Sequence, residues 1–350
     1  VSARRGIKAN SAETIFQGLA PDGGLYVPVI EGAPNSFMTP RAEPGESPAA
    51  LFKRCEEFVL KELFGDLPSE VRADAVNRLM SRFPAEDPVP LKEKDSLTML
   101  ELFHGLTGAF KDVALSMLPV LMRYASSGRR VLVLTATSGD TGSAAMQGFA
   151  GVEGTEIVVF YPASGTSRIQ RLQMTTPAEA NVHAVGIRGN FDDAQAAVKR
   201  IFADPSVNAD AASAGVTLSS ANSINTGRLV PQIAYYVYAG ARIGDKFDVV
   251  VPSGNFGNIL AAYYAKLMGE HTELMLLKAE GYKRIRLETD RAACEMELDK
   301  VLENSQPWEK IALTLDGKKE SLTAVRNFWT MRIIPNWTSR FAMLSSRQKK

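Results

Sequence analysis

The clearest sign of the chain's architecture is the segment VLVLTATSGDTGSAAMQGFA, residues Val131–Ala150. It opens with an almost continuous apolar run, Val131–Thr137, which is typical of a strand buried on both faces. Ser138–Gly142 then form a glycine-rich turn, and a helix is expected from about Ser143. A strand, a tight turn and a helix in this order predict one unit of a parallel α/β sheet.

Three further apolar runs share this character and alternate with helical patterns: Glu156–Pro162, Val182–Ile187 and Phe247–Pro252. Strands rich in Val, Ile and Leu that alternate with helices favour a doubly wound parallel sheet covered on both faces. Two helical patterns, at 49–64 and 69–82, precede the sheet. We therefore expect an α/β fold with an N-terminal helical segment.

Proline-rich stretches and changes in sequence pattern divide the chain into three parts. Proline-rich stretches close an N-terminal unit at residues 1–95, the α/β pattern occupies 96–269, and a divergent segment follows at 270–350. A helix is expected within the last part at Ile285–Glu303. The end of the chain is rich in Lys and Arg and carries no motif that would support nucleic-acid binding.

Composition narrows the class of protein. The 350 residues are 45% hydrophobic and 23% charged, which fits a globular enzyme. The formal net charge of +1 gives no overall positive potential that would attract nucleic acid. No apolar run reaches membrane-spanning length. Two cysteines, Cys55 and Cys294, exclude a disulfide framework, and three scattered histidines give no metal-ligand spacing. We expect a cytoplasmic protein that binds neither membrane, nucleic acid nor metal.

Two strand–turn–helix junctions are candidate anion sites, namely Ser138–Gly142 and Ser253–Asn258. Ligands of open α/β sheets bind beyond the carboxyl ends of the strands, where glycines admit a ligand and helix N-termini attract anions. The alternative is a pair of tight turns with ordinary helix caps. Neither loop matches a nucleotide-binding fingerprint.

Lys111, within ELFHGLTGAFKDVALSM (Glu101–Met117), stands in an apolar neighbourhood at the start of a predicted helix. The alternative to a functional role is a solvated surface lysine. Where its charge is disfavoured, however, the amine would have a lowered pKa and be nucleophilic. A Schiff-base lysine together with an anion cradle is what pyridoxal phosphate requires.

A third segment, LSSANSINTGR, clusters neutral donors beside one arginine. Asn225 and Arg228 are three residues apart and can share a helix face, with Asn222 just before them. Such a set suits a phosphate or carboxylate. The alternative is a helix N-cap formed by Ser223 or Asn225, with Arg228 exposed.

Taken together, these motifs resemble one family. GLAPDGGLYVP, ELFHGLTGAFKD, TATSGDTGSAA, SSANSINTGR and VPSGNFGNILAAYYAK occur in the order and spacing of threonine synthases, over about residues 11–269. The resemblance implies a fold-type II pyridoxal-phosphate enzyme, similar to the tryptophan synthase β chain. It also implies the conversion of O-phospho-L-homoserine and water into L-threonine and phosphate.

The resemblance also assigns roles to residues. Lys111 matches the lysine that carries pyridoxal 5'-phosphate. The cofactor phosphate would be held by Gly254, Asn255, Phe256, Gly257 and Asn258. The substrate carboxylate and the cofactor ring would face Ser138, Gly139, Asp140, Thr141 and Gly142. The substrate phosphate would meet Asn222, Asn225 and Arg228. His104 either lines the site or packs structurally.

The resemblance stops after Gly269, so we expect the later part of the large domain to be incomplete or altered. Three alternatives to threonine synthesis stay open: a phospho-lyase that yields 2-oxobutyrate, a serine or threonine dehydratase, and a truncated non-catalytic homologue. The oligomeric state is expected to be a monomer or a homodimer.

Overall fold

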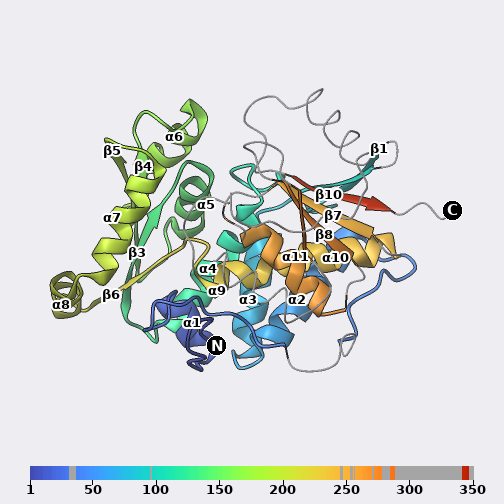
Figure 1. Ribbon diagram of the computed structural model, residues 1–350, viewed down its shortest axis with the longest axis horizontal. Helices are drawn as coiled ribbons and strands as arrows, with labels where there is room; N and C mark the ends of the chain where they lie inside the picture. The colour runs from blue at the N-terminus through green and yellow to red at the C-terminus, as the bar shows by residue number, and fades with distance from the viewer. Residues whose placement is uncertain are drawn as a thin grey trace.

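The structure is a computed structural model, which describes residues 1–30, 37–94, 97–244, 247–252, 255, 257–269, 272–277, 284–287 and 341–346. The described strands form two sheets, ordered β5–β4–β3–β6 and β1–β2–β10–β7–β8–β9. The sheets lie on opposite sides of the molecule, with helices between them (Figure 1).

The smaller sheet carries the segment that first indicated the fold. Its strands are β3 (Arg130–Ala136), β4 (Thr155–Pro162), β5 (Val182–Ile187) and β6 (Val216–Ser219), and every pairing is parallel. Val131 and Val133 of β3 belong to the main core, whereas Leu134 and Ala136 face α7 (Phe191–Ala203). Helices therefore cover both faces, which confirms the doubly wound parallel arrangement expected from the sequence.

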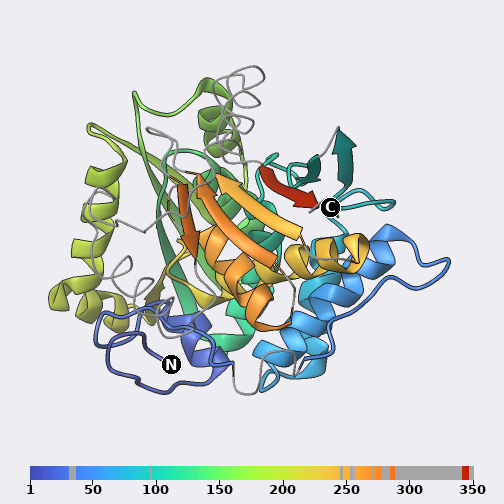
Figure 2. The same cartoon turned by 45° about the vertical axis from the view of Figure 1, so that its right-hand side comes forward.

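The larger sheet is mixed rather than parallel. Its strands are β1 (Leu91–Lys94), β2 (Leu97–Glu101), β7 (Phe247–Pro252), β8 (Thr272–Leu277), β9 (Arg284–Leu287) and β10 (Phe341–Ser346). Only β7 and β8, which come forward in Figure 2, pair in parallel. Two residues join β1 to β2, and so short a connection permits only an antiparallel pair.

Part of the expected C-terminal structure differs from the sequence prediction. A strand, β9, occupies Arg284–Leu287, so the helix predicted from Ile285 does not begin there. The remainder of that predicted helix lies outside the described residues.

Several of the remaining helices share one apolar core. The bounds of the remaining helices are α1 (Ser11–Gln17), α2 (Pro48–Leu63), α3 (Ser69–Met80), α4 (Lys111–Ala125), α5 (Asp140–Phe149), α6 (Arg168–Thr175), α8 (Pro205–Ser213), α9 (Thr226–Leu229), η1 (Val230–Ile233), α10 (Ala234–Ile243) and α11 (Gly257–Leu267). The predicted helices at 49–64 and 69–82 are confirmed as α2 and α3. One apolar cluster joins α1, α2, α4, α10 and α11. The division of the chain at residues 95 and 269 stays a prediction.

Helices α4 and α5 touch through their backbones. Pro119 inside α4 has no N–H to give the carbonyl of Leu115, four residues earlier. Gly148 of α5 packs against that carbonyl so closely that a Cβ would lie 2.2 Å from its oxygen. Arg78 of α3 donates to the Gly148 carbonyl at 2.8 Å. This crossing fixes two helices whose first residues are Lys111 and Asp140.

Candidate active site

The loop before α4 is wound around a buried carboxylate. Asp112, 4% exposed, accepts hydrogen bonds from the backbone N–H of Thr107 at 2.9 Å and from its hydroxyl at 2.7 Å. Burial raises the pKa of Asp112, and these hydrogen bonds oppose the rise. A Cβ on Gly105 would lie 2.6 Å from the Asp112 Cβ, so only glycine fits there. The loop thereby fixes where Lys111 starts its helix.

The Lys111 side chain points into the protein. It is 14% exposed, its Nζ lies 3.2 Å from Oδ2 of Asp140, and it sits 4.3 Å from the ring centroid of Phe110. Burial lowers the pKa of Lys111, the Asp140 charge raises it, and the Arg228 charge lowers it again. The balance falls below the ordinary value, so the amine gives up its proton more readily than a surface lysine. The solvated alternative does not describe this side chain.

Asp140 is held from both sides. Its Oδ2 faces Lys111, and its Oδ1 accepts a hydrogen bond from Nε2 of Gln170 at 2.6 Å. Gly139, at φ 151°, allows this approach, because a Cβ there would lie 2.3 Å from the Gln170 Cδ. Sequence reasoning missed Gln170. The spacing of Ser167 and Gln170 is that of a capping box, which marks a helix start but says nothing of Asp140.

The turn at Ser138–Gly142 is tied to the strand that precedes it. Thr137 Oγ1 accepts hydrogen bonds from the N–H groups of Gly139 and Gly142, each at 2.9 Å. Ser138 is exposed, and Thr141 is half-buried in the first turn of α5. Within this predicted loop, Asp140 supplies the charged group that meets Lys111. The contacts expected with a substrate carboxylate stay a prediction.

Asn222 uses its side chain to bind the backbone. Its Nδ2 donates to the Ala136 carbonyl at 2.7 Å, and its Oδ1 accepts from the Ala136 N–H at 3.2 Å. These two hydrogen bonds hold the segment after β6 against the end of β3. A contact with the substrate phosphate stays a prediction.

Asn225 is fully buried and has three backbone partners. Its Nδ2 donates to the carbonyls of Ile15 at 2.8 Å and Ser220 at 3.0 Å, and its Oδ1 accepts from the Gly227 N–H at 2.8 Å. The last contact makes Asn225 the N-cap of α9, which confirms the capping interpretation. Its expected contact with the substrate stays a prediction.

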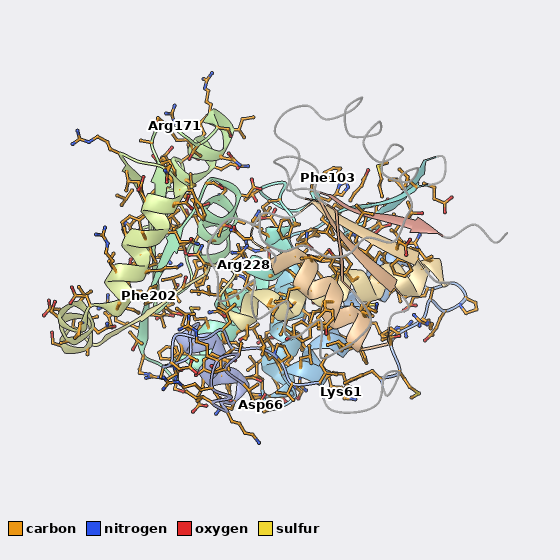
Figure 3. The ribbon with its side chains drawn as sticks, viewed as in Figure 1. Lys61, Asp66, Phe103, Arg171, Phe202 and Arg228 are labelled. Atoms are coloured by element: carbon orange, nitrogen blue, oxygen red, sulfur yellow. The ribbon has the colours of Figure 1, made fainter. Side chains whose placement is uncertain are left out.

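Arg228 lies in the interior, between the two sheets (Figure 3). It is 4% exposed, its Nη1 donates to the Ala221 carbonyl at 3.1 Å, and its Nε has no hydrogen-bond partner. Burial lowers the pKa of Arg228 to about 10, against the raising effect of Tyr235 and Asp140. The alternative in which Arg228 is exposed is therefore wrong. A buried guanidinium with a free N–H is suited to hold an anion.

The predicted cofactor-phosphate loop is described in part. Gly254 and Phe256 lie outside the described residues, whereas Asn255 is exposed and Gly257 begins α11. A Cβ on Gly257 would lie 3.3 Å from the Ser223 Cβ, so this helix start adjoins the segment that carries Arg228. The phosphate contacts themselves stay a prediction.

Asn258, the last residue of the predicted loop, is buried and oriented by two tyrosines. Its Oδ1 accepts hydrogen bonds from the hydroxyls of Tyr235 at 2.7 Å and Tyr236 at 2.6 Å. Burial raises the pKa of both hydroxyls well above the ordinary value, so they stay protonated donors. They fix the first turn of α11 against α10.

His104 is paired and stacked. Its Nε2 lies 2.8 Å from Oε2 of Glu101, and its ring stacks on Phe103 with centroids 4.6 Å apart. These contacts support the structural alternative for His104.

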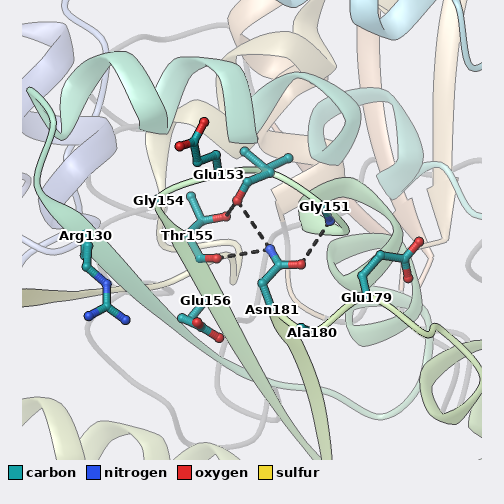
Figure 4. Close-up of a pocket in the computed structure, with 10 residues that line it drawn as sticks. Arg130, Gly151, Glu153, Gly154, Thr155, Glu156, Glu179, Ala180 and Asn181 are labelled. Atoms are coloured by element: carbon teal, nitrogen blue, oxygen red, sulfur yellow. Dashed lines mark hydrogen bonds between the residues drawn. The ribbon is translucent and has the colours of Figure 1, made fainter.

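A surface hollow of about 380 Å³ lies at the opposite end of the smaller sheet, where β3 and β4 begin (Figure 4). Asn181 organises it by donating to the Phe149 and Thr155 carbonyls and accepting from the Gly151 N–H. Among the described residues there is no cluster of three or more His, Cys, Asp or Glu placed for a metal. No helix in the described part of the chain is long and apolar enough to cross a bilayer.

The family of the chain follows from its sequence and agrees with this site. The model of the family described as "Pyridoxal-phosphate dependent enzyme" matches residues 89–346, so the chain belongs to that family. Pyridoxal 5'-phosphate is accordingly its cofactor, as expected. The match continues beyond Gly269, where the motif-based resemblance stops.

Within this family the chain is similar to threonine synthases. It is 37% identical over 286 residues to the threonine synthase of Schizosaccharomyces pombe, covering 76% of this chain and 53% of that protein. It is 36% identical over 280 residues to threonine synthase-like 1 of Mus musculus, covering 74% and 36%. Among solved structures, the PLP-bound threonine synthase from Brucella melitensis superposes with a TM-score of 0.66 at 36% identity, covering 80% of this chain and 60% of that one. The chain spans about half the length of the curated threonine synthases it matches.

The residues present fit the cofactor. An aldehyde needs an amine that is neutral part of the time, and Lys111 has a lowered pKa. A phosphate needs N–H partners, and the N-terminus of α11 offers them at Gly257, where a Cβ would lie 3.3 Å from the Ser223 Cβ.

Proposed function

We propose that this chain is a threonine synthase, which converts O-phospho-L-homoserine and water into L-threonine and phosphate. The observation that carries the proposal is the buried amine of Lys111, which faces Asp140 at 3.2 Å with the Arg228 charge close enough to lower its pKa. Similarity to threonine synthases from three fungi supports the substrate assignment.

In this proposal the cofactor, when bound, withdraws electrons from the substrate so that the protons on Cα and Cβ become acidic. Lys111 Nζ removes the proton from Cα and then moves a proton at Cβ, the adjacent carbon. A single amine can serve adjacent carbons because the lysine stem is flexible. An amine of lowered pKa is neutral often enough at neutral pH to act as the base.

The other residues of the site bind and orient. Asp140 holds the amine of Lys111 and stabilises its protonated form after each transfer. Arg228 supplies an N–H donor to the phosphate that leaves from Cγ, where negative charge develops. The N-terminal turn of α5, which begins at Asp140, would face the substrate carboxylate, because helix N-termini favour anions.

The test has two steps. First, the full chain is purified, mixed with pyridoxal 5'-phosphate and examined for a visible absorbance band, with Lys111→Ala and the control Lys199→Ala compared. Lys199 lies exposed on α7. The band is expected in the wild type and in the control but not in Lys111→Ala. A band of equal strength in Lys111→Ala would overturn the role of Lys111.

Second, products formed from O-phospho-L-homoserine are identified by chromatography. Threonine with one equivalent of phosphate supports the proposal. Formation of 2-oxobutyrate instead identifies the phospho-lyase alternative, and activity on unphosphorylated serine or threonine identifies a dehydratase. A bound cofactor with no product identifies a non-catalytic homologue. We assign the activity to the cytoplasm. We expect the protein to be a monomer or a homodimer, and light scattering, which measures molar mass, distinguishes these two states.

A further inference from the structure

We propose that Gln170 is a positioning residue that holds the Asp140 carboxylate in the orientation that faces Lys111. The inference rests on the proposed role of Lys111 and deepens it. Helix α6 packs against α5, and Gln170, one of its few half-buried polar side chains, reaches Asp140.

The hydrogen bonds define which way the Gln170 amide points. Its Oε1 accepts from the Ser167 hydroxyl at 2.8 Å and from the Ser167 backbone N–H at 3.4 Å. A backbone N–H can only donate, so this end must be the oxygen. The Nε2 end then donates to Asp140 Oδ1 at 2.6 Å, which suits an ionised carboxylate. The amide therefore joins the cap of α6 to the acid of the site.

The neighbouring backbone is shaped for this contact. Gly139 has φ 151°, and a Cβ there would lie 2.5 Å from Gln170 Nε2. Ser143 Oγ of α5 also donates to the Gln170 carbonyl at 3.3 Å, so α5 and α6 are joined at this point twice. The Gln170 amide fills the space that any other residue at position 139 would occupy.

The consequence for Lys111 follows from the charges that face it. These are Asp140 of α5 and Asp112 of α4, which raise the pKa of Lys111, and Arg228 of α9, which lowers it. Of these three charges, Asp140 has the largest effect on the pKa of Lys111. Loss of the Gln170 hydrogen bond makes the ionised form of Asp140 less stable and less well placed, so Lys111 should lose its proton at lower pH.

Two substitutions should move Lys111 in opposite directions. Gln170→Leu removes the donor and keeps much of the side-chain volume, so the pKa of Lys111 should fall. Gln170→Glu keeps the shape but adds a carboxyl group, which becomes negative once it ionises, so the pKa of Lys111 should rise. A purely structural role for Gln170 would not produce shifts of opposite sign.

The experiment measures how fast the Lys111 amine reacts with acetic anhydride as pH is varied, in full-length protein freed of cofactor, with mass spectrometry of the peptide that contains Lys111. At a pH below the wild-type pKa, Lys111 of Gln170→Leu should react roughly three to ten times faster and that of Gln170→Glu correspondingly slower, as shifts of about half to one pH unit require. Gln173→Leu is the matched control, because Gln173 lies on the same helix but donates to the Thr107 carbonyl at 3.1 Å. It should leave the profile within twofold.

Identical profiles for Gln170→Leu, Gln170→Glu and the wild type would overturn the proposal. If Gln170→Leu does not fold, Gln170→Glu and Ser167→Ala, which removes the hydroxyl that holds the far end of the amide, decide the question. The readout is independent of the reaction. Opposite shifts in the pKa of Lys111, in a protein that binds no pyridoxal phosphate, would support the role of Gln170 and reject the proposed function. An absorbance band of the bound cofactor, with no shift in the pKa of Lys111, would reject the role of Gln170 and leave the proposed function standing.

Discussion

The two sides of the site use the same kinds of polar residues differently. On one side, Asp140 turns its carboxylate toward the Lys111 amine, with its other oxygen held by Gln170. On the other side, the side-chain amides of Asn222 and Asn225 form hydrogen bonds with backbone atoms. The comparison teaches that a polar residue in a ligand-binding loop can either meet the ligand or fasten the loop. The kind of partner separates the two roles, because Asp140 meets other side chains whereas Asn222 and Asn225 bind backbone atoms.

The largest effect on stability should come from Asn225→Ala. This change leaves two buried carbonyls and one N–H without partners and removes the N-cap of α9, for a loss of about 2–4 kcal/mol in the free energy of unfolding. Urea denaturation followed by circular dichroism measures it. A loss below about 1 kcal/mol would mean that water replaces the amide and that the fastening role is overstated.

Asp140→Asn should cause the next largest change, and it should affect chemistry rather than stability. The negative charge that raises the pKa of Lys111 disappears, so the pKa falls further and the amine becomes a weaker base. We expect threonine formation to slow by about 10- to 100-fold, within the range of general base catalysis. Steady-state kinetics measures the rate.

The sign can be checked independently of the rate. In protein freed of cofactor, the amine of Lys111 should become reactive at lower pH in Asp140→Asn than in the wild type. A shift toward higher pH would contradict the electrostatic role given to Asp140. The two proteins should unfold at similar urea concentrations, because asparagine has the same shape.

Arg228→Lys should weaken substrate binding by a smaller factor. The variant keeps the charge but loses the planar N–H donors, including the Nε that has no protein partner. KM for O-phospho-L-homoserine should rise about tenfold, the equivalent of one lost hydrogen bond to a charged group. Inhibition by inorganic phosphate should weaken in parallel. An unchanged KM would place the substrate phosphate elsewhere.

Asn222→Ala should have the smallest effect, and on stability alone. Loss of its two bonds to Ala136 should cost about 1 kcal/mol, while kcat/KM should stay within about threefold. A drop of a hundredfold in kcat/KM would restore Asn222 as a substrate ligand. Such a result would remove the distinction between the two sides of the site.

The sequence predicted the elements that repeat a simple pattern. The four strands expected at 131–137, 156–162, 182–187 and 247–252 are present as β3, β4, β5 and β7, because continuous apolar runs between turns leave few other structures. The edges of the larger sheet were not predicted. β1 and β2 are short and partly charged, with β1 largely exposed and β2 half-buried, so no periodicity marks them.

The site was predicted unevenly for a similar reason. Lys111 could be found because a charge in an apolar setting is unusual, and Asp140 because it lies in a glycine-rich turn. Gln170 comes 30 residues later in sequence and meets Asp140 only through the packing of α6 on α5. For Arg228 the sequence left open both an anion-binding role and an exposed position beside a helix cap, because its burial depends on the neighbouring core.

The contact between Gly148 and the Leu115 carbonyl has a consequence for mutational tolerance. The Cβ of any other residue at position 148 would lie 2.2 Å from the Leu115 oxygen, so α5 would have to move away from α4. Those two helices begin with Asp140 and Lys111, so the displacement would open the ion pair between these residues. A survey of random variants would then report Gly148 as essential, although it lies about two helical turns from Asp140.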